Sequence, residues 1–391
     1  EEKKRGEISK ETRAARMVLV TKIAQSCQEK VLITDYNEVI EKQLSIQPHY
    51  MIGMEDLTIP VLMLCNLMHP VFAPNPNHII NYQNNTLDYF KKQQSGEYGA
   101  KTALEDVAKF LVLHAYDYAS AFQAGKNSLS TSKDGIAISY GGAMHSRRWI
   151  NSLNFGKREV KFDEKLPEAY LIAQSLTLGV VNGHPTDIPY HILGVGTPIL
   201  IALIGYQLRH SRAVSIDSTA PFKDAFIGKL YGSKHAYIKM DMFKLVAYNL
   251  INNKTFYSSS PFYKSFAQKY EHDWVGLRKK LGIKPNYSVK ELTVLLKQRG
   301  DLLEAYLPFF TPITGSLERG FLQDLRIARA GYNYWELKKI CSNVKKRRGN
   351  KPLFKKWIEN QVERYTRVAS YKWAKTVEQT YELTERYRLI D

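Results

Sequence analysis

Acidic side chains stand directly after short apolar segments at two places in the chain. Asp217 ends the apolar part of AVSIDST, residues 213–219, and the pair Glu55 and Asp56 follows YMIGM, residues 50–54. A carboxylate held rigidly at a strand end can act as a nucleophile or as a selective hydrogen-bond acceptor. We therefore count Asp217 and the pair Glu55 and Asp56 among the residues that could do chemistry. Capping of the following turn or helix is the structural alternative for each.

Glycines end two further apolar segments. GIAISYG, residues 135–141, runs into the pair Gly141 and Gly142, and YHILGVG, residues 190–196, contains Leu193 and Gly194. Glycine lets the backbone approach a ligand closely, although the same residues could make a simple tight turn.

The segments that must position these residues alternate between strand and helix patterns. Strands are expected at 50–54, 135–141, 190–196 and 213–219, with helices at 102–122, 167–181 and 199–209 and a loop at 66–85. Near-continuous apolar strands separated by helices favour parallel pairing in an α/β fold. We predict a (β/α)8 TIM-like barrel over residues 1–257, whose active site would lie at the carboxyl ends of its strands.

A basic, mostly helical region is expected over residues 258–391. Lysine and arginine outnumber aspartate and glutamate by 56 to 38 in the 391 residues, a formal charge of +18, which favours a polyanionic partner. The stretch GFLQDLRIARAGYNYWELKKI from Gly320, followed by KKRRGNKPLFKKW, interleaves cations with the aromatic residues Tyr332, Tyr334, Trp335 and Trp357. This combination suits stacking on bases and contact with phosphates. A solvated basic surface over an aromatic core is the alternative. The candidate nucleic-acid contacts are Arg147, Arg148, Lys345, Lys346, Arg347 and Arg348.

Other features limit the remaining classes of protein. No apolar run reaches the roughly 20 residues that a bilayer requires, so we expect no membrane association. Cys27, Cys65 and Cys341 are odd in number and far apart, which predicts neither a disulfide framework nor a thiolate metal site and makes the cytoplasm the expected compartment.

Four of these blocks, in order, resemble the tRNA-guanine transglycosylase superfamily. They are ITDYNEVIEKQLSIQPHYMIGMED from Ile33, DGIAISYGGAMHS from Asp134, DIPYHILGVGTP from Asp187, and SIDSTAP from Ser215. The resemblance implies that Asp217 attacks the anomeric carbon of a guanosine nucleotide and that a 7-deazaguanine base then replaces guanine. It also implies that Asp56 accepts hydrogen bonds from the purine, with Glu55 as a competitor because the alignment is looser there. The Gly141-Gly142 backbone would donate one hydrogen bond, and Leu193 would cover the base beside Gly194. Lys223 falls where the family has an arginine that meets the polynucleotide.

Departures from the family pattern refine this expectation. The cysteine-rich zinc motif is absent, so no cofactor is expected, and this absence with the basic tail is more similar to the branch that places 7-deazaguanine bases into DNA. tRNA remains a possible substrate. The family's first catalytic aspartate segment has no counterpart, which we attribute to residues missing upstream, with divergence or a completing protein partner as alternatives. An inert nucleic-acid-binding subunit and an unrelated barrel enzyme for a phosphorylated metabolite are the competing hypotheses.

Overall fold

The computed structural model describes residues 50–53, 76–95, 107–132, 134–140, 148–232, 237–283 and 287–389, together with isolated residues between 11 and 45. The chain forms two compact units. One comprises Glu1–Val195, Gln207–Asp217 and Ser370–Asp391, and the other comprises Gly196–Tyr206 and Ser218–Ala369. The division at residue 257 stays a prediction about sequence regions.

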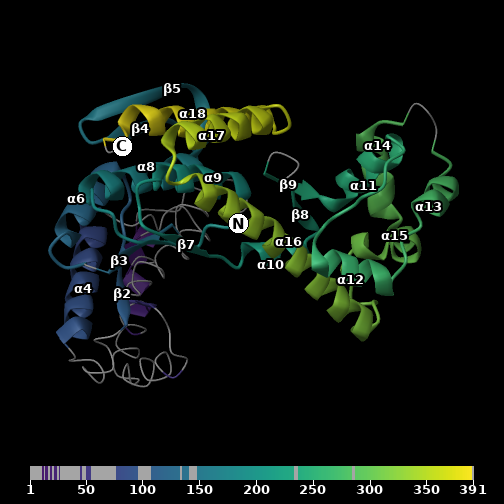
Figure 1. Cartoon of the computed structure of the whole chain (residues 1–391), viewed down its shortest axis with the longest axis horizontal. Coiled ribbons are helices and arrows are strands. Elements are labelled where there is room, and N and C mark those ends of the chain that lie inside the picture. Colours follow the sequence, from purple (N-terminus) through teal and green to yellow (C-terminus); the bar gives the residue numbers. More distant parts are fainter. Residues whose placement is uncertain are drawn as a thin grey trace. The chain divides into compact units, whose positions relative to one another are not determined.

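A five-stranded parallel sheet, half of a barrel, is the centre of the first unit (Figure 1). The strand order is β1-β2-β3-β6-β7. The strands are β1 (Tyr50–Ile52), β2 (Ala108–Leu113), β3 (Gly135–Ser139), β6 (Tyr190–Leu193) and β7 (Val214–Asp217). The α/β class and the strands expected near 50, 135, 190 and 213 are confirmed. Within the described residues the parallel sheet has these five strands, not eight.

The two faces of the sheet differ in what they contact. Ile136, Ile138 and Tyr140 alternate onto one face, and the Tyr140 hydroxyl lies 2.6 Å from Thr177 Oγ1 of α8. The pairing of Ala137 with His191 and of Leu193 with Asp217 places these four residues on the opposite face, called the Asp217 face below. The first face packs on a helix, whereas the Asp217 face carries both polar and apolar side chains.

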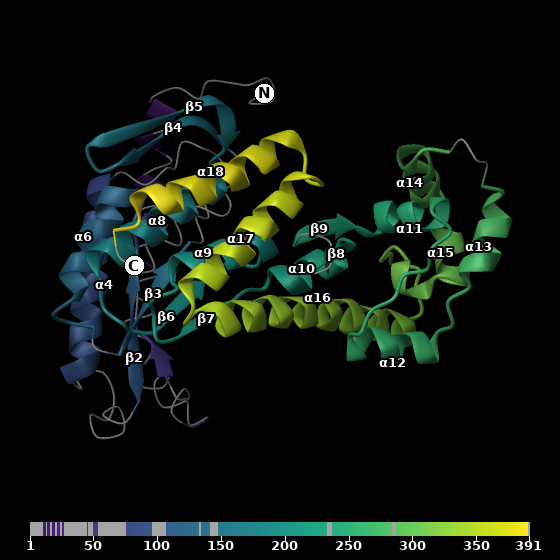
Figure 2. The same ribbon diagram turned by 45° about the horizontal axis from the view of Figure 1, so that its top comes forward.

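Helices α6 (Tyr118–Ser128) and α8 (Glu168–Gly183) pack side by side against the sheet (Figure 2). α6 begins at a capping box in which Asp117 accepts from the Ser120 backbone N–H at 2.8 Å. The helix expected at 167–181 is confirmed as α8, nearly all of whose residues are buried. A helix that is apolar all round is stable only inside a protein.

Two sequence predictions in this unit are wrong. The helix expected at 102–122 is divided into β2 and α6, because KFLVL is a continuous apolar run that suits a central strand and Asp117 starts a new helix. The loop expected at 66–85 is helical from residue 76, since α4 spans Pro76–Ser95. Buried Thr86, Phe90 and Gln93 recur at helical spacing and fix that helix to the sheet. Residues 66–75 lie outside the described residues.

A hairpin and the last helix complete the first unit. β4 (Trp149–Phe155) and β5 (Arg158–Pro167) pair in antiparallel fashion, and α18 (Tyr371–Tyr387) packs against β5 and α8. The Asn182 side chain donates to Tyr387 O at 2.8 Å and accepts from the Leu389 N–H at 3.0 Å. These bonds explain why the final residues belong to the unit that contains the sheet.

The second unit is mostly helical. It also contains a small antiparallel hairpin that the sequence did not predict, made by β8 (Lys229–Gly232) and β9 (Ile238–Asp241). Its helices are α9 (Pro198–Gln207), α10 (Ala220–Phe226), α11 (Met242–Ile251), α12 (Pro261–Lys269), α13 (Trp274–Leu281), α14 (Val289–Gln298), α15 (Gly300–Tyr306), the short η2 (Pro308–Phe310), α16 (Arg319–Arg347) and α17 (Lys351–Thr366). The helix expected at 199–209 is confirmed as α9.

An aromatic core holds the helices of the second unit around α16. Phe309 and Phe310 are fully buried and their rings make edge contacts with Tyr263 and Trp274, respectively. Arg329 of α16 is also fully buried and donates to Phe309 O at 2.7 Å. Burial lowers the pKa of its guanidinium to about 9, because a charge loses its hydration inside a protein. No helix in the described part of the chain combines the length and apolar character needed to cross a membrane.

Candidate active site

Asp217 ends β7 on the Asp217 face, and its side chain is 60% exposed. The Gly194 backbone N–H donates a hydrogen bond to Asp217 Oδ1 at 2.9 Å. Gly194 has a φ of 79°, a left-handed conformation that glycine adopts without steric cost. The turn after β6 therefore orients the carboxylate of the neighbouring strand while leaving it accessible to a ligand.

His191 lies two residues before Leu193 on the same face of β6, with only 8% of its side chain exposed. Its Nδ1 is 2.8 Å from Ser215 Oγ, and its Nε2 is 4.0 Å from Asp217 Oδ1. Burial lowers the pKa of His191, and the negative charge of Asp217 opposes this effect only in part. The imidazole is therefore neutral near pH 7, and a neutral ring at this distance does not form an ion pair with the carboxylate.

Aromatic and apolar side chains continue the Asp217 face toward β1. The Tyr50 ring stacks on Phe110 with centroids 4.9 Å apart, and lies 6.1 Å from the His191 ring. Leu193 packs against a small buried cluster that includes Phe110. Tyr50 is 40% exposed. The face thus offers an exposed carboxylate beside a flat apolar wall, which suits a planar ligand that carries polar edges.

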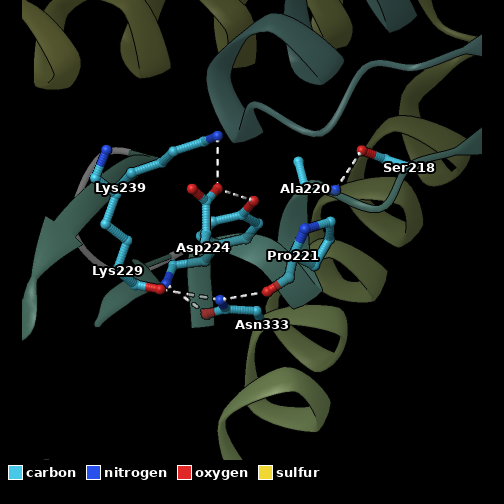
Figure 3. Close-up of polar contacts among 8 residues, drawn as sticks. Ser218, Ala220, Pro221, Asp224, Lys229, Lys239 and Asn333 are labelled. Carbon is cyan, nitrogen blue, oxygen red and sulfur yellow. Dashed lines mark hydrogen bonds and ion pairs between the residues drawn. The ribbon is translucent and has the colours of Figure 1, made fainter. Parts of the chain in front are cut away.

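The segment after Asp217 is tightly packed within the second unit. Ala220 is the first residue of α10, and its N–H donates a hydrogen bond to Ser218 Oγ at 3.1 Å (Figure 3). A Cβ added to Gly196 would lie 2.3 Å from Ser218 Oγ and 2.4 Å from Ala220 Cβ. Gly196 is therefore needed here, because a side chain would displace the residues that directly follow the candidate nucleophile.

Asn333 of α16 fixes α10 and β8 by three hydrogen bonds (Figure 3). Its amide donates to Pro221 O at 2.9 Å and to Lys229 O at 3.0 Å, and its carbonyl accepts from the Tyr231 N–H at 2.9 Å. Asn333 is fully buried, so each bond replaces one to water. This arrangement holds the start of α10 against β8 and α16 within the second unit.

A second polar group stabilises the same hairpin. The Tyr231 hydroxyl donates to Asp224 Oδ2 at 2.6 Å, and Lys239 Nζ lies 2.7 Å from the same oxygen (Figure 3). Asp224 is buried, and both of its partners come from the β8–β9 hairpin. Its carboxylate is committed to structure, in contrast to the exposed carboxylate of Asp217.

The candidate base-binding residues are only partly described. Leu193, Gly194 and Asp217 come together at the ends of β6 and β7, as the sequence predicts. Glu55, Asp56, Gly141, Gly142 and Arg147 lie outside the described residues.

The candidate nucleic-acid contacts occupy different environments. Lys223 is exposed on α10, and Lys345 and Lys346 are exposed near the end of α16. Arg347 is held over the Trp357 ring at 5.0 Å, Arg348 is half-buried, and Arg148 binds the buried carboxylate of Glu168 through two hydrogen bonds of 2.8 and 2.9 Å. The three lysines and Arg148, whose side chain is 59% exposed, are thus accessible to a polymer.

No family model matches the chain, and no curated protein matches it. The candidate site therefore rests on residue spacing and geometry. Among the described residues, no group of three histidine, cysteine or acidic side chains is placed to hold a metal ion.

His191 and Ser215 are site residues that the sequence reasoning missed. Each lies two positions before a residue that was named, Leu193 or Asp217. Because side chains alternate along a strand, the period of two could have shown that they share its face.

Proposed function

We propose that the chain exchanges guanine in nucleic acid, DNA in preference to tRNA, for a 7-deazaguanine base such as preQ0. The observation that carries this proposal is the Asp217 carboxylate, exposed at a strand end, oriented by the Gly194 N–H and bordered by an aromatic wall. A carboxylate that keeps its lone pairs available at a fixed position is suited to attack an electrophilic carbon.

The exchange divides into two substitutions at one carbon. An Asp217 oxygen forms a bond to the sugar's C1′ as the C1′–N9 bond breaks, and guanine leaves with the electron pair and takes up a proton from solvent. The incoming 7-deazaguanine base then loses its N9 proton, forms a bond to C1′ and releases the carboxylate. No oxidant or other co-reactant is needed, and the covalent intermediate preserves the energy of the glycosidic bond.

His191 supports this role of Asp217 as a positioning residue. A protonated imidazole 4.0 Å away would attract the carboxylate and compete with the developing positive charge on the sugar. Because burial lowers the pKa of His191, the ring stays neutral, and its hydrogen bond with Ser215 fixes its orientation. The Asp217 charge is then free to stabilise an electron-poor sugar.

The remaining parts of the base site are proposed from the sequence. Asp56, with Glu55 as its competitor, would accept hydrogen bonds from the purine edge, and the Gly141-Gly142 backbone would donate to its carbonyl. Leu193 would cover one face of the base. We propose that further strands complete a (β/α)8 barrel around this site, and that the protein acts in the cytoplasm.

The charge of +18 supports a polynucleotide as the substrate. Lys223, Arg147, Arg148 and the cations from Lys345 to Arg348 would contact phosphates without reading the sequence. A target nucleotide in a duplex must leave the base stack before a side chain can reach its C1′.

An incorporation assay tests the proposal. The protein is incubated with labelled preQ0 and either duplex DNA or tRNA, and the label in the polymer is counted. We expect Asp217→Ala to abolish incorporation but to leave binding of the polymer within about twofold. Asp163→Asn is the matched control, because Asp163 is an exposed aspartate on β5 of the same unit, and it should retain full activity.

The possible results separate the alternatives. Label in tRNA alone would identify a tRNA enzyme, and binding of either polymer without incorporation would indicate an inert subunit. Weak binding of both polymers would favour an enzyme of small phosphorylated metabolites. Incorporation by Asp217→Ala at the normal rate would refute the assignment of the nucleophile.

A further inference from the structure

A cavity of about 460 Å³ lies within the second unit, lined by α16, α17 and Tyr237. Its volume falls within the roughly 300–1,000 Å³ range of small-ligand sites. Its lining residues all belong to the second unit, so the cavity shares no residue with the candidate active site.

The spacing of residues along α16 and α17 explains why both helices direct polar and aromatic side chains into the cavity. On α16 the lining residues include Trp335, Lys338, Ser342 and Lys346, which are separated by three or four positions. Residues at that spacing form a single stripe along a helix. Trp357, Gln361 and Arg364 form the corresponding stripe on α17, and the two stripes face one another across the cavity.

The charge of the lining is strongly positive. Lys338, Lys339, Lys346 and Arg364 line the cavity, and none of its lining residues is acidic. Lys339 is paired with the neighbouring Glu336 at 2.6 Å. The described part of the chain provides no carboxylate partner for Lys338 or Lys346, both of which are exposed. Such a group of cations favours an anion.

Flat aromatic surfaces accompany these cations. The rings of Tyr237 and Trp357 are 6.0 Å apart and inclined at 58°, and Lys338 Nζ lies 6.0 Å from the Trp335 ring. Tyr237 has a φ of 57°. A bulky residue is rarely left-handed, and such strain persists where the surrounding structure requires it. Here it accompanies a tyrosine ring that lines the cavity.

Unsatisfied polar atoms also mark this cavity as a binding site. Trp335 Nε1 and Gln361 Oε1 are buried without a hydrogen-bond partner in the described residues, and both residues line the cavity. An indole N–H can only donate and an amide oxygen can only accept. A ligand that offers both an acceptor and a donor, as a nucleobase does, would satisfy the two atoms.

We propose that this cavity binds a nucleotide, with the phosphate on Lys338 and Lys346 and the base against Trp335 and Trp357. Cations beside aromatic rings are the combination by which proteins bind nucleotides without regard to sequence. The nucleotide is either a residue of a single strand or a free mononucleotide, since both carry the same base and phosphate. The cavity does not require Asp217 to be a nucleophile.

Binding of thymidine monophosphate to the full chain, measured by calorimetry, tests this proposal. Thymine is chosen because the proposed guanine site would reject it, whereas stacking tolerates any base. We expect saturable binding, with thymidine and inorganic phosphate each at least about tenfold weaker because each lacks one half of the ligand. A thymidine trinucleotide that binds more tightly than the monophosphate would identify a nucleic-acid strand as the source, and the reverse order would identify a free nucleotide.

Paired variants locate the site. Lys338→Gln/Lys346→Gln should weaken binding about tenfold, and Trp357→Leu at least about fivefold. Arg319→Gln/Lys356→Gln removes the same charge from exposed positions on the same two helices that do not line the cavity, and should change binding less than about twofold. Absence of saturable binding by both probes, or equal effects of the two paired variants, would overturn the proposal whether or not the chain exchanges bases.

Discussion

Gly196→Ala tests whether the packing after β7 controls the position of Asp217. The added methyl would lie 2.4 Å from Ala220 Cβ and 2.3 Å from Ser218 Oγ. Carbon atoms pack best at about 3.5–4.0 Å, so the segment must move by about 1 Å. Ser218 is bonded directly to Asp217, and this movement therefore reaches the candidate nucleophile.

The expected effect is larger on the rate than on stability. Overpacking of this kind costs about 1–3 kcal/mol of unfolding free energy. A displacement of about 1 Å at a reacting group can lower the rate about 100-fold. Gly315→Ala is the control, because an added Cβ at Gly315 would meet no heavy atom within 4 Å.

The assay compares initial rates of preQ0 incorporation with thermal unfolding of the same samples. We expect Gly196→Ala to remain folded at the assay temperature and to lose about two orders of magnitude in rate, while Gly315→Ala changes neither. A folded Gly196→Ala protein with a normal rate would refute the view that this packing positions Asp217.

Three further predictions concern stability and polymer binding. Asn333→Leu should lower the unfolding free energy in urea by about 3 kcal/mol, because it leaves the buried Tyr231 N–H and two carbonyls without partners; a loss below about 1 kcal/mol would contradict this. Burial, reinforced by the charges of Arg388 and Arg209, lowers the pKa of His210 to about 4, so between pH 6.5 and 4 the unfolded state binds a proton that the folded state does not. The unfolding free energy in urea should therefore fall over this pH range by at most about 3 kcal/mol, and by less because His210 is partly exposed. His210→Gln should reduce this pH dependence, and an unchanged pH dependence would exclude His210 as its cause. Replacing Lys223 and Lys345 with Gln should weaken DNA binding on all sequences and reduce its salt slope by about 1 for each phosphate that the protein no longer neutralises; an unaltered slope would remove them from the interface.

The sequence predicted those elements whose local pattern agrees with their tertiary role. β6 and β7 are short apolar runs that end at Gly194 and Asp217, and both are parallel strands of the sheet, as such runs indicate. α8 is a long apolar helix that precedes them. In each case length, composition and flanking residues favour the same structure.

The elements that were predicted wrongly have sequences that fit two kinds of local structure. Apolar residues of β2 and α6 together match a helical period, and only the capping box at Asp117 shows that a new helix begins there. α4 contains many asparagines and follows several prolines, which usually indicate a loop. Its helix is stabilised by Phe90 and its neighbours on one face, a tertiary contribution that overrides weak local propensity.

The part of the candidate site that lies at the ends of two neighbouring strands was predicted from the sequence. The Asp217–Gly194 contact joins the ends of two strands that were expected in that order, so parallel pairing brings the residues together. The cavity beside α16 was only partly foreseen. Trp335 and Trp357 were expected to stack on bases, but Tyr237 adjoins a hairpin that no sequence pattern indicated.

Trapping of the covalent intermediate tests the central claim most directly. The protein is incubated with a guanine-containing DNA oligonucleotide in the absence of an incoming base, quenched in acid and digested for mass spectrometry. We predict that the peptide carrying Asp217 is covalently bound to a nucleotide that has lost its guanine. Base exchange that proceeds with the adduct on another residue, or with no adduct formed, would contradict the role of Asp217 as the nucleophile.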